Sequence, residues 1–243
     1  VGGFMLIRPF LIAFPLVFAA LLSACSVSGG HHVNVSGDVP TAIGNNDRIV
    51  LVLASYIDCE DQNKPDCEAP KESASVESSF ERCTGTAIRA RIPSINIMRA
   101  REFREKVFPG LEFKDSPRSE DDLLVALADP ATRTKMEVLG LRYILVLQVE
   151  TRDGQRTWAS GASQGGVAFV HEWDRTSHVQ AFVVDIFERK RAGTVDVSNV
   201  QRKGSGFGIA YIIPFPIYYA SNVESQSCRE LGLELADFIK GKV

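Results

Sequence analysis

LRYILVLQVE, residues 141–150, is the stretch that decides the fold. Its odd-numbered positions from Leu141 to Val149 are all apolar, whereas Arg142, Gln148 and Glu150 mark the even-numbered side. Alternation with a period of two is typical of a strand that lays one face on a core. We therefore expect a core strand here, and the neighbouring segments can be assigned relative to it.

The segments before this strand alternate between strand and helix patterns. Arg48 to Tyr56 (RIVLVLASY) is continuously apolar, as expected of a buried central strand. Short strand and helix patterns then follow at 73–91 (helix), 94–98 (strand), 99–108 (helix), 119–127 (helix) and 129–140 (helix). This alternation predicts crossover connections and a sheet with helices packed on it.

The segments after the strand have a different pattern. Thr151 to Ser160 is polar and contains Gly154, so no core strand is expected there. Three β patterns, at 167–173, 178–187 and 194–201, indicate an antiparallel meander. Ser221 and Glu224 form a capping-box pattern ahead of an amphipathic helix to Ile239. The expected fold class is α/β (α+β): a mixed sheet with a βαβα first half, a meander in the second half and a C-terminal helix, in one domain at 45–243.

The first 44 residues indicate export. Arg8 precedes an apolar run from Pro9 to Leu22, which is too short to span a bilayer and is ordered like a secretory signal. Leu22-Ser-Ala-Cys25 resembles the bacterial lipobox, which implies removal of residues 1–24 and acylation of Cys25. The alternative is an ordinary signal peptide that is cleaved after Ala24.

The residues that follow Cys25 refine the expected location. Ser26 stands where the inner-membrane retention signal has aspartate, which favours the periplasmic face of the outer membrane. Residues 25–44 are rich in Ser, Gly, Asn and Val, and we expect a flexible tether. The lipid would make the membrane one partner of this chain.

The charge balance excludes one large class of partners. The chain has 27 basic and 30 acidic residues, a net charge of −3, and therefore lacks the basic field that nucleic-acid binding requires.

Four cysteines besides Cys25 predict two disulfides in an oxidising periplasm. Cys83 and Cys228 each lie on the apolar face of a helical pattern, whereas Cys59 and Cys67 lie in a polar segment. We therefore predict the pairs Cys59–Cys67 and Cys83–Cys228. A zinc site is the alternative, although no close Cys-x-x-Cys pair supports it.

The residues around Cys59 and Cys67 are acidic, from Asp58 to Glu68. Calcium prefers such oxygen clusters, but the ordered spacing of an EF-hand is missing, so a solvated loop is expected.

The order of these elements, together with INIMRAREFREKVFPG (95–110) and WDR (173–175), resembles a group of proteobacterial lipoproteins with a TolB amino-terminal-like α/β fold. The curli-secretion lipoprotein and the lipoprotein activators of penicillin-binding proteins are loosely similar. The resemblance covers about residues 45–240 and implies binding of protein partners in the envelope rather than chemistry. It transfers no functional residue to this chain.

Gly161-Ala-Ser163-Gln-Gly165 fits the G-x-S-x-G pattern of a hydrolase nucleophile. That serine needs a turn between a buried strand and a helix. Here the preceding segment is polar and the following one is β-like, so a catalytic Ser163 is only an alternative.

His171-Glu172 begins like the H-E-x-x-H zinc motif, but Arg175 takes the place of the second histidine. His171, Asp174 and His178 could still gather at a hairpin end and bind a metal ion. The simpler interpretation is a polar turn beside Trp173.

The most unusual segment is YIIPFPIYY, residues 211–219, which combines seven large apolar side chains with two prolines. The prolines exclude an inner strand or a helix. The segment is either a buried crossing or an exposed patch for a partner or membrane. In the second case Tyr211, Phe215, Ile217, Tyr218 and Tyr219 are the candidate binding residues.

These observations favour a non-enzymatic, lipid-anchored envelope protein that binds a protein partner or takes part in assembly, without a cofactor. The alternatives are a serine hydrolase that uses Ser163 and a sensor that binds a small ligand or metal ion.

Overall fold

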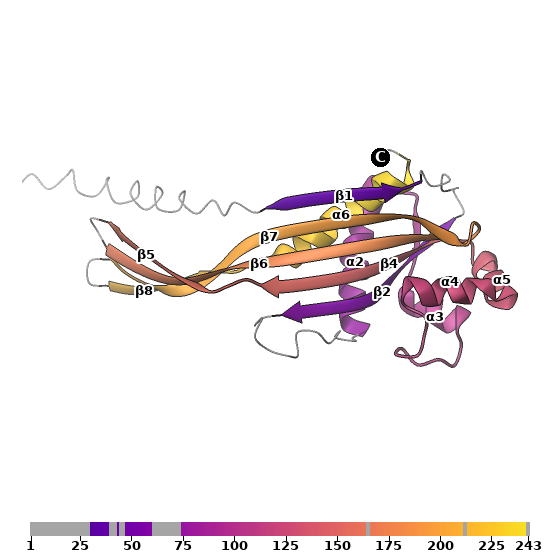
Figure 1. The fold of residues 1–243 in the computed structure, drawn as a ribbon, viewed down its shortest axis with the longest axis horizontal. Helices are drawn as coiled ribbons and strands as arrows, with labels where there is room; N and C mark the ends of the chain where they lie inside the picture. The colour runs from indigo at the N-terminus through magenta and orange to yellow at the C-terminus, as the bar shows by residue number, and fades with distance from the viewer. Residues whose placement is uncertain are drawn as a thin grey trace, which may run out of the picture.

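The structure is a computed structural model that describes residues 30–38, 43, 47–59, 74–163, 166–210 and 213–241. The predicted signal segment and Cys25 lie outside these residues. The fold is α/β, as predicted: a mixed sheet of eight strands with five helices among the described residues (Figure 1).

Six strands of the sheet lie side by side, and two more pair with the extended ends of the two longest strands. The order is β1 (His31–Gly37), β7 (Lys190–Ala210), β6 (Gly166–Asp185), β4 (Leu141–Asp153), β2 (Arg48–Cys59) and β3 (Asn96–Met98), with β5 (Thr157–Ser163) on β6 and β8 (Ile213–Tyr219) on β7. β2 is parallel to β3 and β4, and every other pair is antiparallel. The parallel part is the expected βαβα half and the antiparallel part is the expected meander.

The helices form a layer on each face of the sheet. One layer is α2 (Ala74–Arg91) and α6 (Val223–Ile239); the other is α3 (Ala100–Val107), α4 (Glu120–Ala128) and α5 (Pro130–Val138). Two of the predicted helix starts are capped as the sequence suggests. Ser119 Oγ accepts the N–H of Asp122 at 3.1 Å, and Asp129 accepts the N–H of Thr132 at 2.9 Å.

The strand that decides the fold is buried on both faces. Tyr143, Leu145 and Leu147 of β4 pack in the layer of α2 and α6. Ile144 and Val146, on the other side of the same strand, pack in the layer of α3 to α5. β4 is therefore a central strand between two cores.

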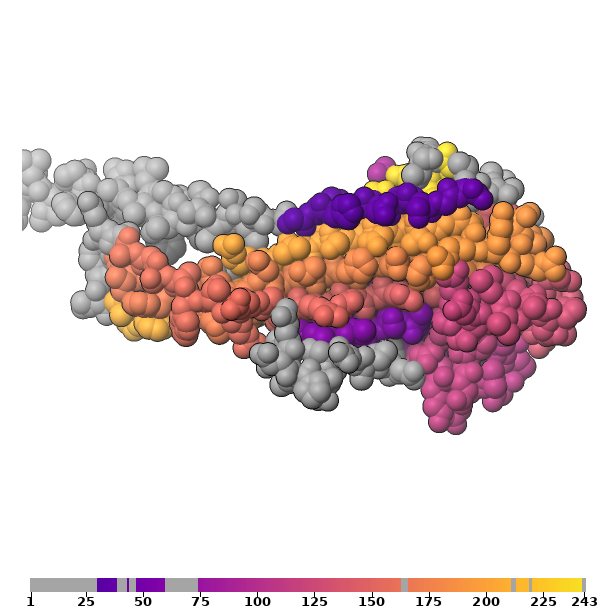
Figure 2. Space-filling model, viewed as in Figure 1, coloured from indigo at the N-terminus to yellow at the C-terminus, as the bar shows by residue number. Residues whose placement is uncertain are grey.

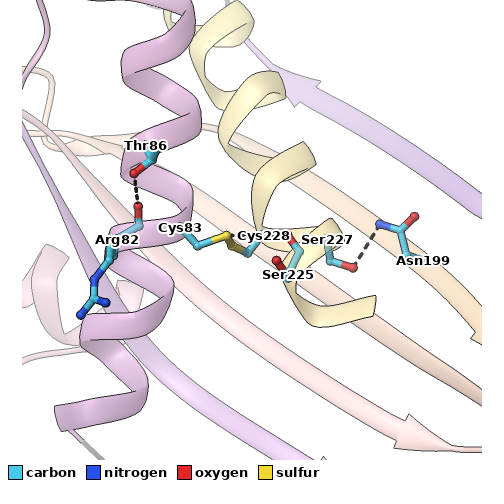
Figure 3. Close-up of a disulfide and its surroundings, with 7 residues drawn as sticks. All are labelled: Arg82, Cys83, Thr86, Asn199, Ser225, Ser227 and Cys228. Carbon is cyan, nitrogen blue, oxygen red and sulfur yellow. Dashed lines mark hydrogen bonds between the residues drawn. A yellow bond between two sulfur atoms is a disulfide. The ribbon is translucent and has the colours of Figure 1, made fainter. Parts of the chain in front are cut away.

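A disulfide joins the two helices of one layer. Cys83 of α2 is bonded to Cys228 of α6, as predicted; their Cα atoms are 6.1 Å apart and the residues are 145 positions apart in sequence (Figure 3). Nearby, Gly232 of α6 brings the two helices close together, because a Cβ atom on it would stand 2.5 Å from the Thr84 carbonyl oxygen. Cys59 is buried at the end of β2, and its predicted partner, Cys67, lies outside the described residues.

The structure corrects several boundaries. His31–Gly37, which the sequence assigned to the flexible tether, forms the edge strand β1, because Val33 and Val35 alternate with polar residues and pair with Val197 and Val195 of β7. The β patterns at 167–173 and 178–187 are one strand of 20 residues. The polar segment after Glu150 extends β4 and then forms β5.

The predicted capping box of the last helix forms only in part: Ser221 Oγ accepts the N–H of Val223 at 3.2 Å, but the part predicted for Glu224 is wrong. α6 begins at Val223 behind Asn222, and Glu224 does not turn back to cap it. Its carboxylate instead accepts a hydrogen bond from Arg175 of β6.

Candidate interaction surface

The two central strands are much longer than their neighbours. β6 has 20 residues and β7 has 21. β4 pairs with β6 only from Arg175 to Asp185, and β1 pairs with β7 only from Gly193 to Asn199. The outer halves continue as a projection that none of the described helices covers (Figure 1).

This projection is a four-stranded antiparallel sheet, which we call the arm. It consists of Thr157–Ser163, Gly166–Glu172, Gly204–Ala210 and Ile213–Tyr219, in the order β5, β6, β7 and β8. Figure 2 shows it as a narrow extension of the wider body. Because β5 and β8 are the outer strands, both edges of the arm are unpaired within the described residues.

One face of the arm carries a series of exposed aromatic rings. The register aligns Trp158, His171, Ser205 and Tyr218 in one row across the four strands. In the next row Phe169 and Phe207 lie opposite each other, with ring centroids 5.6 Å apart. Directly paired residues share a face, so these rows form one continuous surface.

These rings are open to solvent to an unusual extent for aromatic side chains. Trp158 is 73% exposed, Phe169 42%, Phe207 50% and Tyr218 70%. The ring of Trp158 stacks on His171 at 4.9 Å, which fixes its orientation on the sheet.

The opposite face combines small residues with the apolar side chains of β8. Gly208 lies under the ring of Phe215, because a Cβ atom on this glycine would stand 2.5 Å from that ring. Phe215 is still 43% exposed and Ile213 is 67% exposed. Both faces of the arm are therefore apolar.

The YIIPFPIYY segment is thus not the buried crossing that was one of the two alternatives. It is the edge strand β8, and an edge is where a sheet tolerates Pro214 and Pro216. Phe215 and Tyr218 are exposed and Ile217 is half-buried. Tyr211 lies outside the described residues, and Tyr219 is the last residue of β8, opposite Gly204.

The outer arm carries no ionisable side chain apart from His171 and the tyrosines. No Asp, Glu, Lys or Arg occurs between Thr157 and His171, or between Gly204 and Val223. The first charged residues stand at the base of the arm: Arg156, Glu172, Lys203 and Glu224. The boundary between charged body and uncharged arm is therefore sharp.

A buried arginine ties the base of the arm to the body. Arg175 of β6, whose side chain is 10% exposed, donates to Asp153 of β4 at 2.7 Å and to Asp58 of β2 and Glu224 of α6 at 2.8 Å each. Asp153 also accepts the indole N–H of Trp173 at 2.8 Å. Four elements thus meet at one guanidinium.

The charges of this group shift two pKa values. Burial lowers the pKa of Arg175, but its hydrogen bonds to Asp153 and Glu224 and the charges of Asp58 and Asp153 outweigh this effect and raise the pKa. The pKa of neighbouring Tyr56 is raised by burial and by the charges of Glu224 and Asp58. Arg175 stood out in the sequence within the WDR segment and as the residue in place of a zinc-binding histidine, but this group was not predicted, because its three acidic partners follow no spacing rule.

The structure does not place Ser163 on a nucleophile elbow. Ser163 is the last residue of β5, paired with Gly166 of β6, so a strand rather than a helix follows the turn. Gln164 and Gly165 of the motif lie outside the described residues. The context of a catalytic serine is therefore missing.

The three candidate metal ligands are not brought together. His171 lies on the aromatic face, whereas Asp174 and His178 project from the opposite face of β6. His178 Nδ1 is 3.4 Å from Asp196, and Asp174 is 3.7 Å from Arg202. Within the described ranges no group of three or more His, Cys, Asp or Glu side chains is arranged to hold a metal ion.

In the part of the chain that the structure describes, no helix has both the length and the apolar character needed to cross a bilayer.

Comparisons with known proteins find distant structural likenesses but no family. No family model matches this chain, and no curated protein matches it. Among solved structures, the chain is similar to the PelC dodecamer from Paraburkholderia phytofirmans, with 10% identity, coverage of 87% of this chain and 98% of that chain, and a TM-score of 0.37.

Two further solved structures are similar at the same distant level. The neuraminyllactose-binding hemagglutinin homologue from Helicobacter pylori has 9% identity, coverage of 86% of this chain and 88% of that one, and a TM-score of 0.30. The hypothetical protein CT253 from Chlamydia trachomatis has 7% identity, coverage of 79% and 98%, and a TM-score of 0.30. At these identities and TM-scores, the likenesses carry no argument about function.

Proposed function

We propose that this chain is a non-enzymatic protein of the bacterial envelope, anchored by a lipid on Cys25 at the periplasmic face of the outer membrane. It acts by docking its arm onto another component of the envelope, as a partner-binding or assembly module. The observation that carries this proposal is the arm itself, a paired sheet with exposed apolar side chains on both faces.

Large exposed apolar surfaces are rare on isolated soluble domains and usually mark a contact. Trp158, Tyr218 and Phe215 suit such a contact, because aromatic side chains bury much area and lose little conformational freedom. The sheet and the stacking on His171 also hold the rings in place before binding.

The alternatives draw no support from the geometry. Ser163 lacks the elbow, and His171, Asp174 and His178 are divided between two faces of one strand. The resemblance to envelope lipoproteins of the TolB amino-terminal-like set favours the same interpretation as the arm does, which is binding of a partner rather than catalysis.

In-cell crosslinking of the full-length protein tests this function. A photoactivatable side chain at position 218 should capture an envelope component, whereas the same group at position 187 should not. Phe187 is the matched control, because it is 51% exposed but lies in the turn between β6 and β7 at the opposite end of the molecule.

A double substitution makes the test more specific. Phe215→Ser with Tyr218→Ser should abolish capture from a probe at Trp158 and leave the melting temperature unchanged. Capture that persists in this variant, or a collapse of its stability, would contradict docking through the arm.

A further inference from the structure

We infer that the component onto which the arm docks is the lipid bilayer itself: the uncharged end of the arm enters the leaflet that holds the lipid on Cys25. This inference rests on the proposed function, because it requires that anchor. Three independent features of the chain support it: the position of the anchor, the length of the uncharged zone and the residues at its boundary.

β1 begins at the end of the body from which the arm projects. It starts at His31, opposite Asn199 of β7, and the Gly30 carbonyl accepts the N–H of Val200 at 2.9 Å. β7 continues from Val200 toward the arm, which begins four residues further on at Gly204. The described chain that follows Cys25 in sequence therefore starts close to the base of the arm.

The segment between Cys25 and β1 is shorter than the part of β7 beyond Val200. Cys25 is five positions before Gly30, which is at most about 18 Å of fully extended chain. From Val200 to Ala210 β7 continues for ten positions, about 33 Å. With Cys25 at the membrane surface and the arm directed toward it, the arm reaches that surface before its end, and its outer part enters the lipid or lies within its surface layer.

The uncharged zone begins about as far from Val200 as Cys25 can lie from Gly30. Gly204, where the charged residues of β7 end, is four residues beyond Val200, or about 13 Å, close to the reach of Cys25. Beyond it, the seven residues each of β5 and β8 extend for about 23 Å, more than the roughly 15 Å of hydrocarbon in one leaflet.

The residues at this boundary are those that bilayer interfaces favour. Trp173 lies at the base of the arm, with the Arg156 guanidinium 5.0 Å and the Lys203 ammonium 5.5 Å from its ring centroid. Trp and Tyr gather at headgroup level, and Lys and Arg there reach lipid phosphates. Trp158 and Tyr218 follow one row further along the arm.

The edges of the sheet limit how deep the arm goes. Pro214 and Pro216 lie opposite Ile209 and Phe207, so the outer edge of β8 lacks two backbone donors that lipid would leave unsatisfied. β5 has no proline and keeps its donors. The arm therefore lies tilted in the headgroup and upper acyl region, where water still reaches the edge of β5.

The two tryptophans of this chain provide the experiment. The lipidated protein is reconstituted in phosphatidylcholine vesicles whose acyl chains are brominated near the headgroup. With Trp173→Phe, the remaining Trp158 should lose at least about half of its fluorescence to bromine quenching, because it lies inside the boundary. With Trp158→Phe, the remaining Trp173 should be quenched far less.

Charge substitutions provide the matched control. In the Trp173→Phe background, adding Phe207→Asp should abolish the quenching of Trp158, because a carboxylate does not enter the acyl region. Adding Phe187→Asp, at the opposite end, should leave the quenching intact. Circular dichroism before and after addition of vesicles checks that each variant is folded.

The outcomes separate this inference from the function on which it rests. Unquenched Trp158 in vesicle-bound protein, or equal quenching of both tryptophans, would overturn insertion. If the probe at position 218 then captures an envelope protein in cells, docking through the arm stands and the partner is that protein. A chain that does not associate with vesicles at all would instead refute the anchor.

Discussion

Arg175 and Asp153 face each other on neighbouring strands at the base of the arm, joined by a hydrogen bond of 2.7 Å between Nη1 and Oδ1. Asp153 is 2% exposed and also accepts the indole N–H of Trp173. Asp153→Ala would leave a buried guanidinium with one partner fewer and an indole donor unsatisfied. We expect the free energy of unfolding to fall by about 2–4 kcal/mol, measured by urea denaturation.

Asp174→Ala is the matched control for this substitution. Asp174 lies next to Arg175 on β6, but its side chain is 58% exposed and stands 3.7 Å from Arg202. We expect a change below about 0.5 kcal/mol. Equal losses for the two variants would contradict a structural role of the Arg175 group.

Cys83 and Cys228 close a loop across most of the domain, because they are 145 positions apart in sequence. Replacing both by alanine should lower the free energy of unfolding by about 4 kcal/mol, because the unfolded chain regains the freedom that the crosslink removes. In denaturant titrations a reducing agent should also destabilise the double variant less than the parent, and the remaining effect would come from the predicted Cys59–Cys67 pair. A parent protein that is equally stable with and without reductant would refute the bond.

The second predicted pair, Cys59–Cys67, is accessible to peptide mapping. Under non-reducing conditions a proteolytic digest should contain the two cysteines in one crosslinked peptide. Alkylation of Cys59 or Cys67 in the unreduced, denatured protein would contradict the pair.

Gly232 sets the distance between α2 and α6, because a Cβ atom there would stand 2.5 Å from the Thr84 carbonyl oxygen, which is backbone and cannot rotate away. Gly232→Val should therefore destabilise the protein by about 1–3 kcal/mol in thermal or chemical unfolding. Gly161→Ala is the comparison, since a Cβ atom on Gly161 meets nothing within 4 Å. We expect no loss of stability for it, and similar losses for both would rule out the helix contact as the cause.

The raised pKa of Tyr56 predicts how the free energy of unfolding changes at alkaline pH. Burial, followed by the charges of Glu224 and Asp58, raises the pKa of this phenol above its ordinary value of about 10. The folded state therefore holds the phenol proton of Tyr56 more tightly than the unfolded state does. The contribution of this group to the free energy of unfolding is complete below about pH 10 and is lost as the pH rises beyond it.

Tyr56→Phe should therefore make the loss of stability above about pH 10 less steep, with the remaining slope due in part to Tyr143, whose pKa is also raised by burial. The measurement is the urea midpoint as a function of pH. Tyr218→Phe, at a side chain that is 70% exposed, should retain the slope of the parent. An unchanged slope in the Tyr56 variant would refute the assignment.

The parts of this fold that the sequence predicts well are those with strong local periodicity. The alternation in 141–150 identifies β4, and the helical phase of Cys83 and Cys228 identifies their disulfide. In the helices the burial of a side chain repeats with the helical period. In β4 the centre is buried on both faces, and the polar residues Arg142, Gln148 and Glu150 toward its ends provide the alternation.

Pairing between distant segments accounts for most of what the sequence did not predict. His31–Gly37 is a strand because it lies beside β7, more than 150 residues away, and TWASGAS (157–163) is a strand because β6 continues past the body. Neither segment has a strong strand propensity, and such propensity depends on context. The arm could not be predicted for the same reason, although its uncharged composition was visible.

The Arg175 group was missed because side-chain contacts depend on the completed fold. Asp58, Asp153 and Glu224 come from three different elements, and only their assembly shows that they converge. Glu224 illustrates the difficulty, since its local sequence suggests a helix cap while its carboxylate binds β6.

β6 and β7 run from the turn that contains Phe187, at one end of the domain, to the arm at the other end, and their register is continuous from Gly166 and Ala210 to Val183 and Gly193. The arm consequently has no hinge. A lateral force at the end of the arm is therefore transmitted to the Arg175 group at its base. The backbone hydrogen bonds that join β1, β7, β6 and β4 resist this force.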